Sequence, residues 1–296
     1  MRTSPLFLVS LVVSSGVFLL PTEAEAEQLY TSNGSTISRF DSAALGTVTT
    51  VPFTGLQTGE SIIGIDIRPF TGAIYGVGSS SRMYTINPLT GAATQVGTAG
   101  AFTLNGTGFG MDFNPVADRI RLVSNTEQSL RLNPNDGTLS GTDTALNPAG
   151  NVVSVAYDRN DLDTATATTL YGIDSAAGTL VLIGSINGTP NSPNTGIVTT
   201  VGSLGLGTSL NESIGFDISG VSGIGFATIT TGGISRLYTI NLATGSATLS
   251  SSNGGAIGSG TTPYFSIAAI PEPGTAAMAS TFTAFAMMRR LRRSAV

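Results

Sequence analysis

The sequence predicts an all-β protein, a β-propeller of five four-stranded blades. Three observations carry this prediction. Short strands of alternating polarity are separated by glycine-closed turns, the same pattern recurs along the chain, and each end of the repeat region holds the piece that the other end lacks. A four-stranded unit repeated at roughly 40–50 residues is typical of propeller blades.

The clearest unit spans residues 63–97, IGIDIRPFTGAIYGVGSSSRMYTINPLTGAATQVG. Ile63, Ile65 and Ile67 alternate with smaller or polar residues, which indicates a strand with two unlike faces. Proline and glycine then mark tight turns at 69–72 and 87–91. These features predict a four-stranded antiparallel meander.

The first strand of this unit recurs three times. GMDFNP at 110–115 and GFDI at 215–218 match GIDIRP at 64–69, and SVAY at 154–157 is a weaker match. The intervals are about 45 residues, with one longer interval that contains two inserts, 159–168 and 185–195. Each match therefore predicts the start of one blade.

The two ends of the repeat region complement each other. Residues 29–51 contain the later strands of a blade without its inner strand, and FSIAAI at 265–270 is an inner strand with nothing after it. We expect Ile267 to pair antiparallel with 29–32, because strand exchange closes the ring and hides the sheet edges. Six blades is the alternative count, and an open solenoid is the alternative architecture.

Composition excludes several kinds of chemistry. The chain has 296 residues, of which 41% are hydrophobic and 10% charged, and its net charge is −5. It contains no cysteine, histidine or tryptophan, which excludes disulfides, thiol nucleophiles, Ser-His-Asp catalysis and histidine-ligated metals. The composition predicts one sizeable core, and the acidic balance argues against a nucleic-acid partner.

The first 26 residues read as a secretory signal peptide. Arg2 precedes an apolar run over 6–20, and Ala24 and Ala26 form an A-x-A cleavage signal. A retained N-terminal anchor is the alternative. Cleavage after Ala26 leaves a propeller domain over 27–270.

Residues 271–296 are predicted to form a second targeting signal, at the C-terminal end of the chain. Their elements in order are the Pro271-Glu272-Pro273 motif, an apolar segment predicted to be helical over 275–288, and a basic cluster of Arg289, Arg290, Arg292 and Arg293. The segment is shorter than the roughly 20 apolar residues that span a bilayer, which favours a temporary anchor. The arginines predict a cytoplasmic C-terminus.

This order of elements resembles the PEP-CTERM sorting tail of Gram-negative bacteria. The resemblance implies an exosortase-type membrane protease as partner, which cleaves near the Pro-Glu-Pro motif. It also implies transit through the inner membrane, then delivery to the cell surface or extracellular matrix, in association with exopolysaccharide.

The body of the chain also resembles a family. The segments GIDIRPFTGAIYGVG, LYTINPLTGAATQVG and GMDFNPVADRIRLVS are similar to the DUF4394 domain, an uncharacterised secreted β-propeller family. The resemblance covers nearly all of 29–270. It implies the fold and brings no catalytic residues with it.

Asp66, Asp112 and Asp217 occupy the same place in three repeats. If the first strands line the central channel, these carboxylates could converge and act as the acid and base of a glycosidase. The more economical interpretation is that each one bonds a turn or backbone amide within its own blade. These residues are therefore candidates for catalysis and carry no firm assignment.

Three further groups have simpler interpretations. Asp158, Asp161 and Asp163 lie on one loop and could bind Ca²⁺, although a solvated loop is the alternative. Arginines at 119, 121 and 131 are expected to pair at the surface with Asp118 or Glu127. Five tyrosines are expected to pack between blades: Tyr30, Tyr75, Tyr84, Tyr171 and Tyr238.

Taken together, these features favour an exported, non-enzymatic propeller that binds or supports exopolysaccharide and needs no cofactor, with Ca²⁺ on the 158–163 loop as the alternative. The alternative is an extracellular carbohydrate-active enzyme that uses the three aspartates. An open cleft around these aspartates, with carboxylates about 5–10 Å apart, would favour the enzyme.

Overall fold

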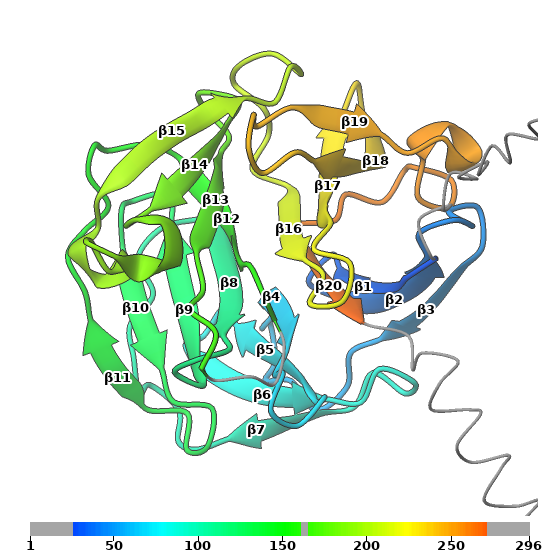
Figure 1. The fold of residues 1–296 in the computed structure, drawn as a ribbon. Coiled ribbons are helices and arrows are strands. Elements are labelled where there is room, and N and C mark those ends of the chain that lie inside the picture. The colour runs from blue at the N-terminus through cyan, green and yellow to red at the C-terminus, as the bar shows by residue number, and fades with distance from the viewer. Residues whose placement is uncertain (1–25, 161–164, 271–296) are drawn as a thin grey trace, which may run out of the picture.

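The computed structural model describes residues 26–160 and 165–270, and they form five four-stranded antiparallel sheets arranged as the blades of a ring (Figure 1). The predicted fold class and blade number are therefore confirmed, and the six-bladed and open-solenoid alternatives are wrong. All of the predicted signal peptide except Ala26, and the predicted sorting tail from Pro271 onward, lie outside the described residues.

Four blades follow the chain from inner to outer strand. The second blade consists of β4 (Ile62–Ile67), β5 (Ile74–Gly78), β6 (Arg82–Ile86) and β7 (Ala93–Val96). The third consists of β8 (Phe109–Asn114), β9 (Arg119–Ser124), β10 (Ser129–Leu132) and β11 (Leu139–Thr142). The fourth consists of β12 (Val152–Tyr157), β13 (Leu170–Asp174), β14 (Thr179–Ile183) and β15 (Val198–Ser203). The fifth consists of β16 (Ile214–Ile218), β17 (Gly225–Thr231), β18 (Ile234–Ile240) and β19 (Ala247–Leu249).

The first blade is built from both ends of the described chain. Its strand order is β20 (Ser266–Ile270), β1 (Gln28–Ser32), β2 (Thr36–Asp41) and β3 (Val48–Pro52). β20 runs antiparallel to β1, with Ile267 opposite Thr31. The hydroxyl of Thr31 also donates to the carbonyl of Ser266 at 2.6 Å. The inner strand of this blade thus comes from the opposite end of the sequence.

Helical structure is confined to three short 3₁₀ segments in the described ranges. They are η1 (Ile186–Gly188) and η2 (Pro193–Thr195), which lie in the 185–195 insert, and η3 (Ser252–Gly255). Across residues 26–160 and 165–270, no helix has the length and apolar character needed to cross a bilayer. The predicted apolar helix over 275–288 lies beyond these residues.

The hydrophobic core is divided among the five blade interfaces. Each cluster of buried side chains joins two neighbouring blades, as where Leu180 of the fourth blade and Phe216 of the fifth pack in one cluster. The buried side chains are therefore divided among the blade interfaces, because a blade buries both faces against its neighbours. The tyrosine prediction is confirmed, since all five lie in or against these clusters: Tyr30, Tyr75, Tyr84, Tyr171 and Tyr238.

Glycines allow the inner strands to approach one another. A Cβ atom on Gly110 would lie 2.7 Å from the Cα of Ser154 on the next inner strand. A Cβ atom on Gly215 would likewise lie 2.6 Å from the carbonyl carbon of Ser266. Real Cβ atoms do not come this close to backbone, so the radius of the ring near its centre depends on these two positions.

Candidate functional site

The three repeated aspartates meet between the inner strands. Asp66 lies on β4, Asp112 on β8 and Asp217 on β16, and one carboxylate oxygen from each lies within 4.8 Å of the others. Their exposed fractions are only 1–2%. The inner strands β12 and β20 place Ala156 and Ala268 at the corresponding position. The convergence considered from the sequence is present, although the carboxylates are buried.

The hydrogen bonds of these carboxylates cross between blades. Oδ2 of Asp66 accepts from the amide of Phe113, and Oδ2 of Asp112 accepts from the amide of Tyr157. Oδ2 of Asp217 accepts from the amide of Ala269. The expected bond to a backbone amide of the same blade is present for Asp66 and Asp217. The bonds between blades were not expected, and they form because the next inner strand lies within hydrogen-bonding distance.

The two alanines explain the remaining bonds. The blade before Ile218 in the ring carries Ala156, and the blade before Ile67 carries Ala268, so neither blade offers these amides a carboxylate. Each amide instead donates to the aspartate that directly precedes it in the sequence, at 2.6 and 2.7 Å. All five inner-strand amides at this level are therefore satisfied by three carboxyl groups. Five of the six carboxyl oxygens accept an amide, and Oδ1 of Asp112 is the sixth.

Burial raises the pKa of each carboxyl group. The pKa values of Asp66 and Asp112 lie well above their ordinary range because of burial, and the charges of neighbouring aspartates raise both further. Burial, and then repulsion from Glu27, raise the pKa of Asp217 to about 7. The carboxyl of Asp112 is within hydrogen-bonding reach of both partners. The cluster thus needs protons or a cation to balance its charge.

This arrangement differs from the open cleft that the enzyme alternative requires. The carboxylate oxygens approach within 4.8 Å, and the side chains are buried under the inner strands. A glycosidase must hold a sugar and, in inverting enzymes, a water between its carboxyl groups. The buried, amide-bonded cluster favours a role in the scaffold or in ion binding.

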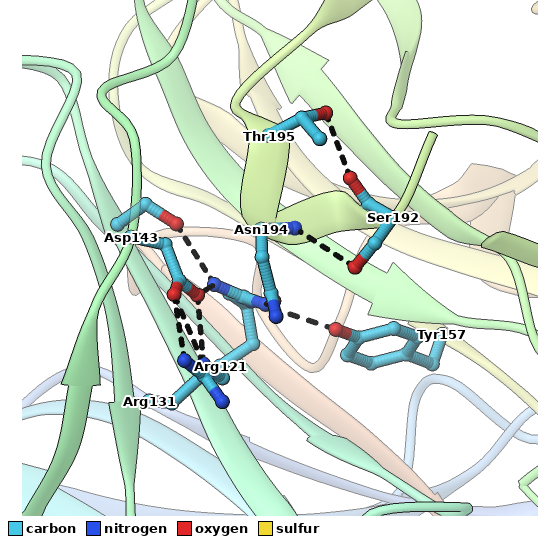
Figure 2. A network of polar contacts seen from close by, with 8 residues as sticks. Arg121, Arg131, Asp143, Tyr157, Ser192, Asn194 and Thr195 are labelled. Carbon is cyan, nitrogen blue, oxygen red and sulfur yellow. Dashed lines mark hydrogen bonds and ion pairs between the residues drawn. The ribbon is translucent and has the colours of Figure 1, made fainter. Parts of the chain in front are cut away.

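A second polar site lies between the third and fourth blades. Arg121 donates to Asp143 at 2.5 Å, and Arg131 donates to both oxygens of the same carboxylate. Figure 2 shows the two guanidinium groups converging on Asp143. Among the described residues, Glu127 forms no ion pair, and Asp118 pairs with Arg68 of the second blade. The predicted surface pairing is therefore wrong.

Arg121 is buried, and its guanidinium group forms hydrogen bonds with residues of both blades. Its side chain is 2% exposed, and it also donates to the hydroxyl of Ser129 and to the side-chain oxygen of Asn194 in η2. The hydroxyl of Tyr157 lies 3.4 Å from its Nε atom (Figure 2). Burial lowers the pKa of Arg121, but contacts with Tyr157 and Asp143 outweigh this and raise it.

A cavity of about 200 Å³ opens beside this network. Arg119, Arg121 and Arg131 line it from the third blade, and Tyr157 and Asn194 line it from the fourth. We refer to this cavity as the arginine pocket. It joins three cationic side chains on one blade to polar groups on the next.

The predicted calcium loop is described only in part. Asp158 accepts from the amide of Thr169 at 2.6 Å and pairs with Arg159 at 3.3 Å. Asp161 and Asp163 lie outside the described residues. The part that is described shows Asp158 engaged with its own blade.

Sequence reasoning missed three residues. Glu27 is 4% exposed, and neither of its carboxylate oxygens has a hydrogen-bond partner. Asp143 joins two arginines, and Asn194 reaches Arg121 from the 185–195 insert. No local pattern marks these positions, because each partner lies on another strand or in another blade.

The fold and these two sites define a five-bladed propeller with a buried carboxylate cluster between its inner strands and an arginine pocket between two blades. The family model described as "Domain of unknown function (DUF4394)" matches residues 36–263. The chain belongs to this family. A comparison with curated protein sequences finds no match.

Several solved structures are similar to this chain at low identity. A structure described as a nidogen/laminin complex is 12% identical with a TM-score of 0.47, covering 82% of this chain and 97% of that one. A Bacteroides thetaiotaomicron protein of unknown function is 13% identical with a TM-score of 0.43, covering 75% and 57%. PorZ, a surface component of the type-IX secretion system of Porphyromonas gingivalis, is 17% identical with a TM-score of 0.38, covering 78% and 29%.

Proposed function

We propose that this protein is an exported, non-enzymatic binding propeller of the cell surface or extracellular matrix, and that its arginine pocket binds an acidic group of an exopolysaccharide. The observation that carries the proposal is the pocket itself, where three arginines from one blade face the polar side chains of the next. The charge, size and position of the pocket each support this function.

The charge of the pocket favours an anion. Asp143 is the one carboxylate that Arg121 and Arg131 share. Among the described residues Arg119 has no carboxylate within 4.0 Å, and its guanidinium donates to the carbonyl of Asp118. An excess of positive charge therefore gathers here in a chain of net charge −5. Guanidinium groups bind carboxylates through paired hydrogen bonds.

The size of the pocket limits what it can hold. Its volume of about 200 Å³ is below the roughly 300–1,000 Å³ of typical small-molecule sites. One charged substituent fits this volume, while the rest of a polymer lies across the blade surface. A polysaccharide with repeated carboxylates would engage such pockets on many copies of the protein, which raises avidity.

The sequences at both ends support export. The residues before Glu27 carry the secretory pattern, and the Pro271-Glu272-Pro273 motif precedes the apolar segment and arginines of the tail. In this proposal an exosortase-type protease cleaves the tail during passage through the inner membrane. Mass spectrometry of the exported protein should find a chain that begins at Glu27 and lacks 276–296. Recovery of the secreted chain with these residues attached would rule out cleavage.

The binding function can be tested with polysaccharides that differ in charge. Isothermal titration calorimetry should detect binding of polygalacturonate and none of neutral dextran, with affinity that falls as salt rises. Arg119→Gln combined with Arg131→Gln should weaken binding at least about tenfold, since each removes a charged donor. Arg82→Gln, on the second blade, is the matched control and should bind as the unmodified protein does. Equal binding by both variants would contradict the arginine pocket.

A further inference from the structure

The buried carboxylate cluster has a feature that the structural role of its aspartates leaves unexplained. Five amides suffice to hold the inner strands together, yet three carboxyl groups remain in contact with one another. At 4 Å, two like charges repel by about 4 kcal/mol at an effective dielectric constant near 20. Among the described residues no arginine pairs with any of the three.

Glu27 adds a fourth carboxylate from an independent direction. Glu27 immediately precedes β1. β1 pairs with β20, and β20 lies beside β16 in the ring. Glu27 is 4% exposed, both of its carboxylate oxygens lack hydrogen-bond partners, and its charge raises the pKa of Asp217. A buried carboxylate with no partner is costly unless something positive lies close to it.

We propose that Asp66, Asp112 and Asp217 together bind one divalent cation of the calcium type between the inner strands β4, β8 and β16, and that Glu27 contributes negative charge nearby. The three aspartates supply one oxygen ligand each, and Oδ1 of Asp112 accepts no backbone amide. Glu27 balances the charge from the β1 side. The cation links the second, third and fifth blades, because each of them contributes one ligand.

The distances suit such an ion. Three oxygens separated by at most 4.8 Å share a central point within about 2.8 Å of each, close to the roughly 2.3–2.6 Å of Ca²⁺–oxygen bonds. An amide uses one lone pair of a carboxylate oxygen, so the oxygen can also bind a cation. Small movements of these side chains are sufficient to complete the coordination.

The surroundings favour Ca²⁺ over Mg²⁺. Mg²⁺ keeps several of its waters and needs near-octahedral geometry, whereas Ca²⁺ accepts irregular oxygen ligands. The three aspartates are only 1–2% exposed, so an ion bound among them would lose most of its water. A site this enclosed therefore favours the ion that loses its water more readily.

The proposal is tested on the full chain after removal of metal with EDTA. Calorimetric titration with CaCl₂ should give one ion per chain, with a Kd on the order of 10⁻⁴ M or tighter. Ca²⁺ at a hundredfold excess over Kd should raise the melting temperature by about 5–10 °C, and Mg²⁺ should raise it less. No binding up to about 10 mM CaCl₂ by the folded protein would overturn the proposal and assign the neutralising role to protons.

Three variants locate the ion. Asp112→Asn keeps an oxygen for the Tyr157 amide but turns an amide donor toward the centre, so both the binding and the thermal shift should be lost. Glu27→Gln breaks no side-chain hydrogen bond and should raise the Kd for Ca²⁺ about tenfold. Asp136→Asn, in an exposed turn of the third blade, is the control and should bind normally. Unchanged Ca²⁺ binding by Glu27→Gln and by any folded Asp112→Asn protein would refute the site.

Discussion

Oδ2 of Asp66 accepts a hydrogen bond of 2.7 Å from the amide of Phe113, although the two residues lie on different blades and 47 positions apart. The same carboxylate also accepts from the amide of Ile67 on its own strand. A residue that recurs in the sequence as part of a local repeat thus joins two repeats in space. Several expected outcomes follow from this relationship and from the packing around it.

Asp66→Asn should lower the free energy of unfolding by about 1–3 kcal/mol, because both carboxyl oxygens accept amides and an asparagine offers only one oxygen. Its amino group would face a backbone donor. Polysaccharide binding at the arginine pocket should stay unchanged. Urea denaturation measures the first effect and calorimetry the second. Stability equal to that of the control Asp136→Asn would contradict the structural role of the bond.

The stability of the metal-free protein should fall as pH rises. An acid whose pKa is higher in the folded than in the unfolded state holds more protons when folded, so its stabilising effect is full below the unfolded value of 3.8. That effect is lost as pH rises through the folded value, about 7 for Asp217. Melting temperatures in EDTA should therefore decrease between about pH 4 and pH 8. A melting temperature that rises over this range would contradict the raised pKa values.

Gly110→Ala should destabilise the ring by about 1–3 kcal/mol, because the new methyl group would meet the backbone of Ser154 at 2.7 Å. Gly46→Ala is the matched control. Its added Cβ meets nothing closer than 3.7 Å, so its unfolding free energy should change little. Thermal denaturation of the two variants side by side would show whether the crowding between inner strands is real.

Removal of 264–270 from a chain that ends at 270 should prevent folding. The deletion takes away β20, which pairs with β1 and contributes Ile267 and Ala269 to the core between the fifth and first blades. It would also expose the edge of β1. Circular dichroism and size-exclusion chromatography of the two chains provide the measurement. A compact, cooperatively unfolding product without β20 would show that the pairing is dispensable.

The sequence by itself was sufficient to predict the architecture. Alternation of Ile63, Ile65 and Ile67 and the glycine-closed turns specify strands and hairpins through local geometry, and recurrence of GIDI-like segments specifies the number of blades. The complementary ends predicted that Ile267 pairs with 29–32, and it lies opposite Thr31. These features are readable because they depend on neighbours in the chain and on a repeated pattern.

Only the tertiary structure decided what the polar residues do. Equivalent positions in a repeat show that Asp66, Asp112 and Asp217 lie at one level, but not that their hydrogen bonds cross to the next blade. The pairing of Arg121 with Asp143 and the burial of Glu27 likewise depend on the distance between strands that are not neighbours in the sequence. That distance results from how five twisted sheets pack against one another, and no stretch of sequence records it.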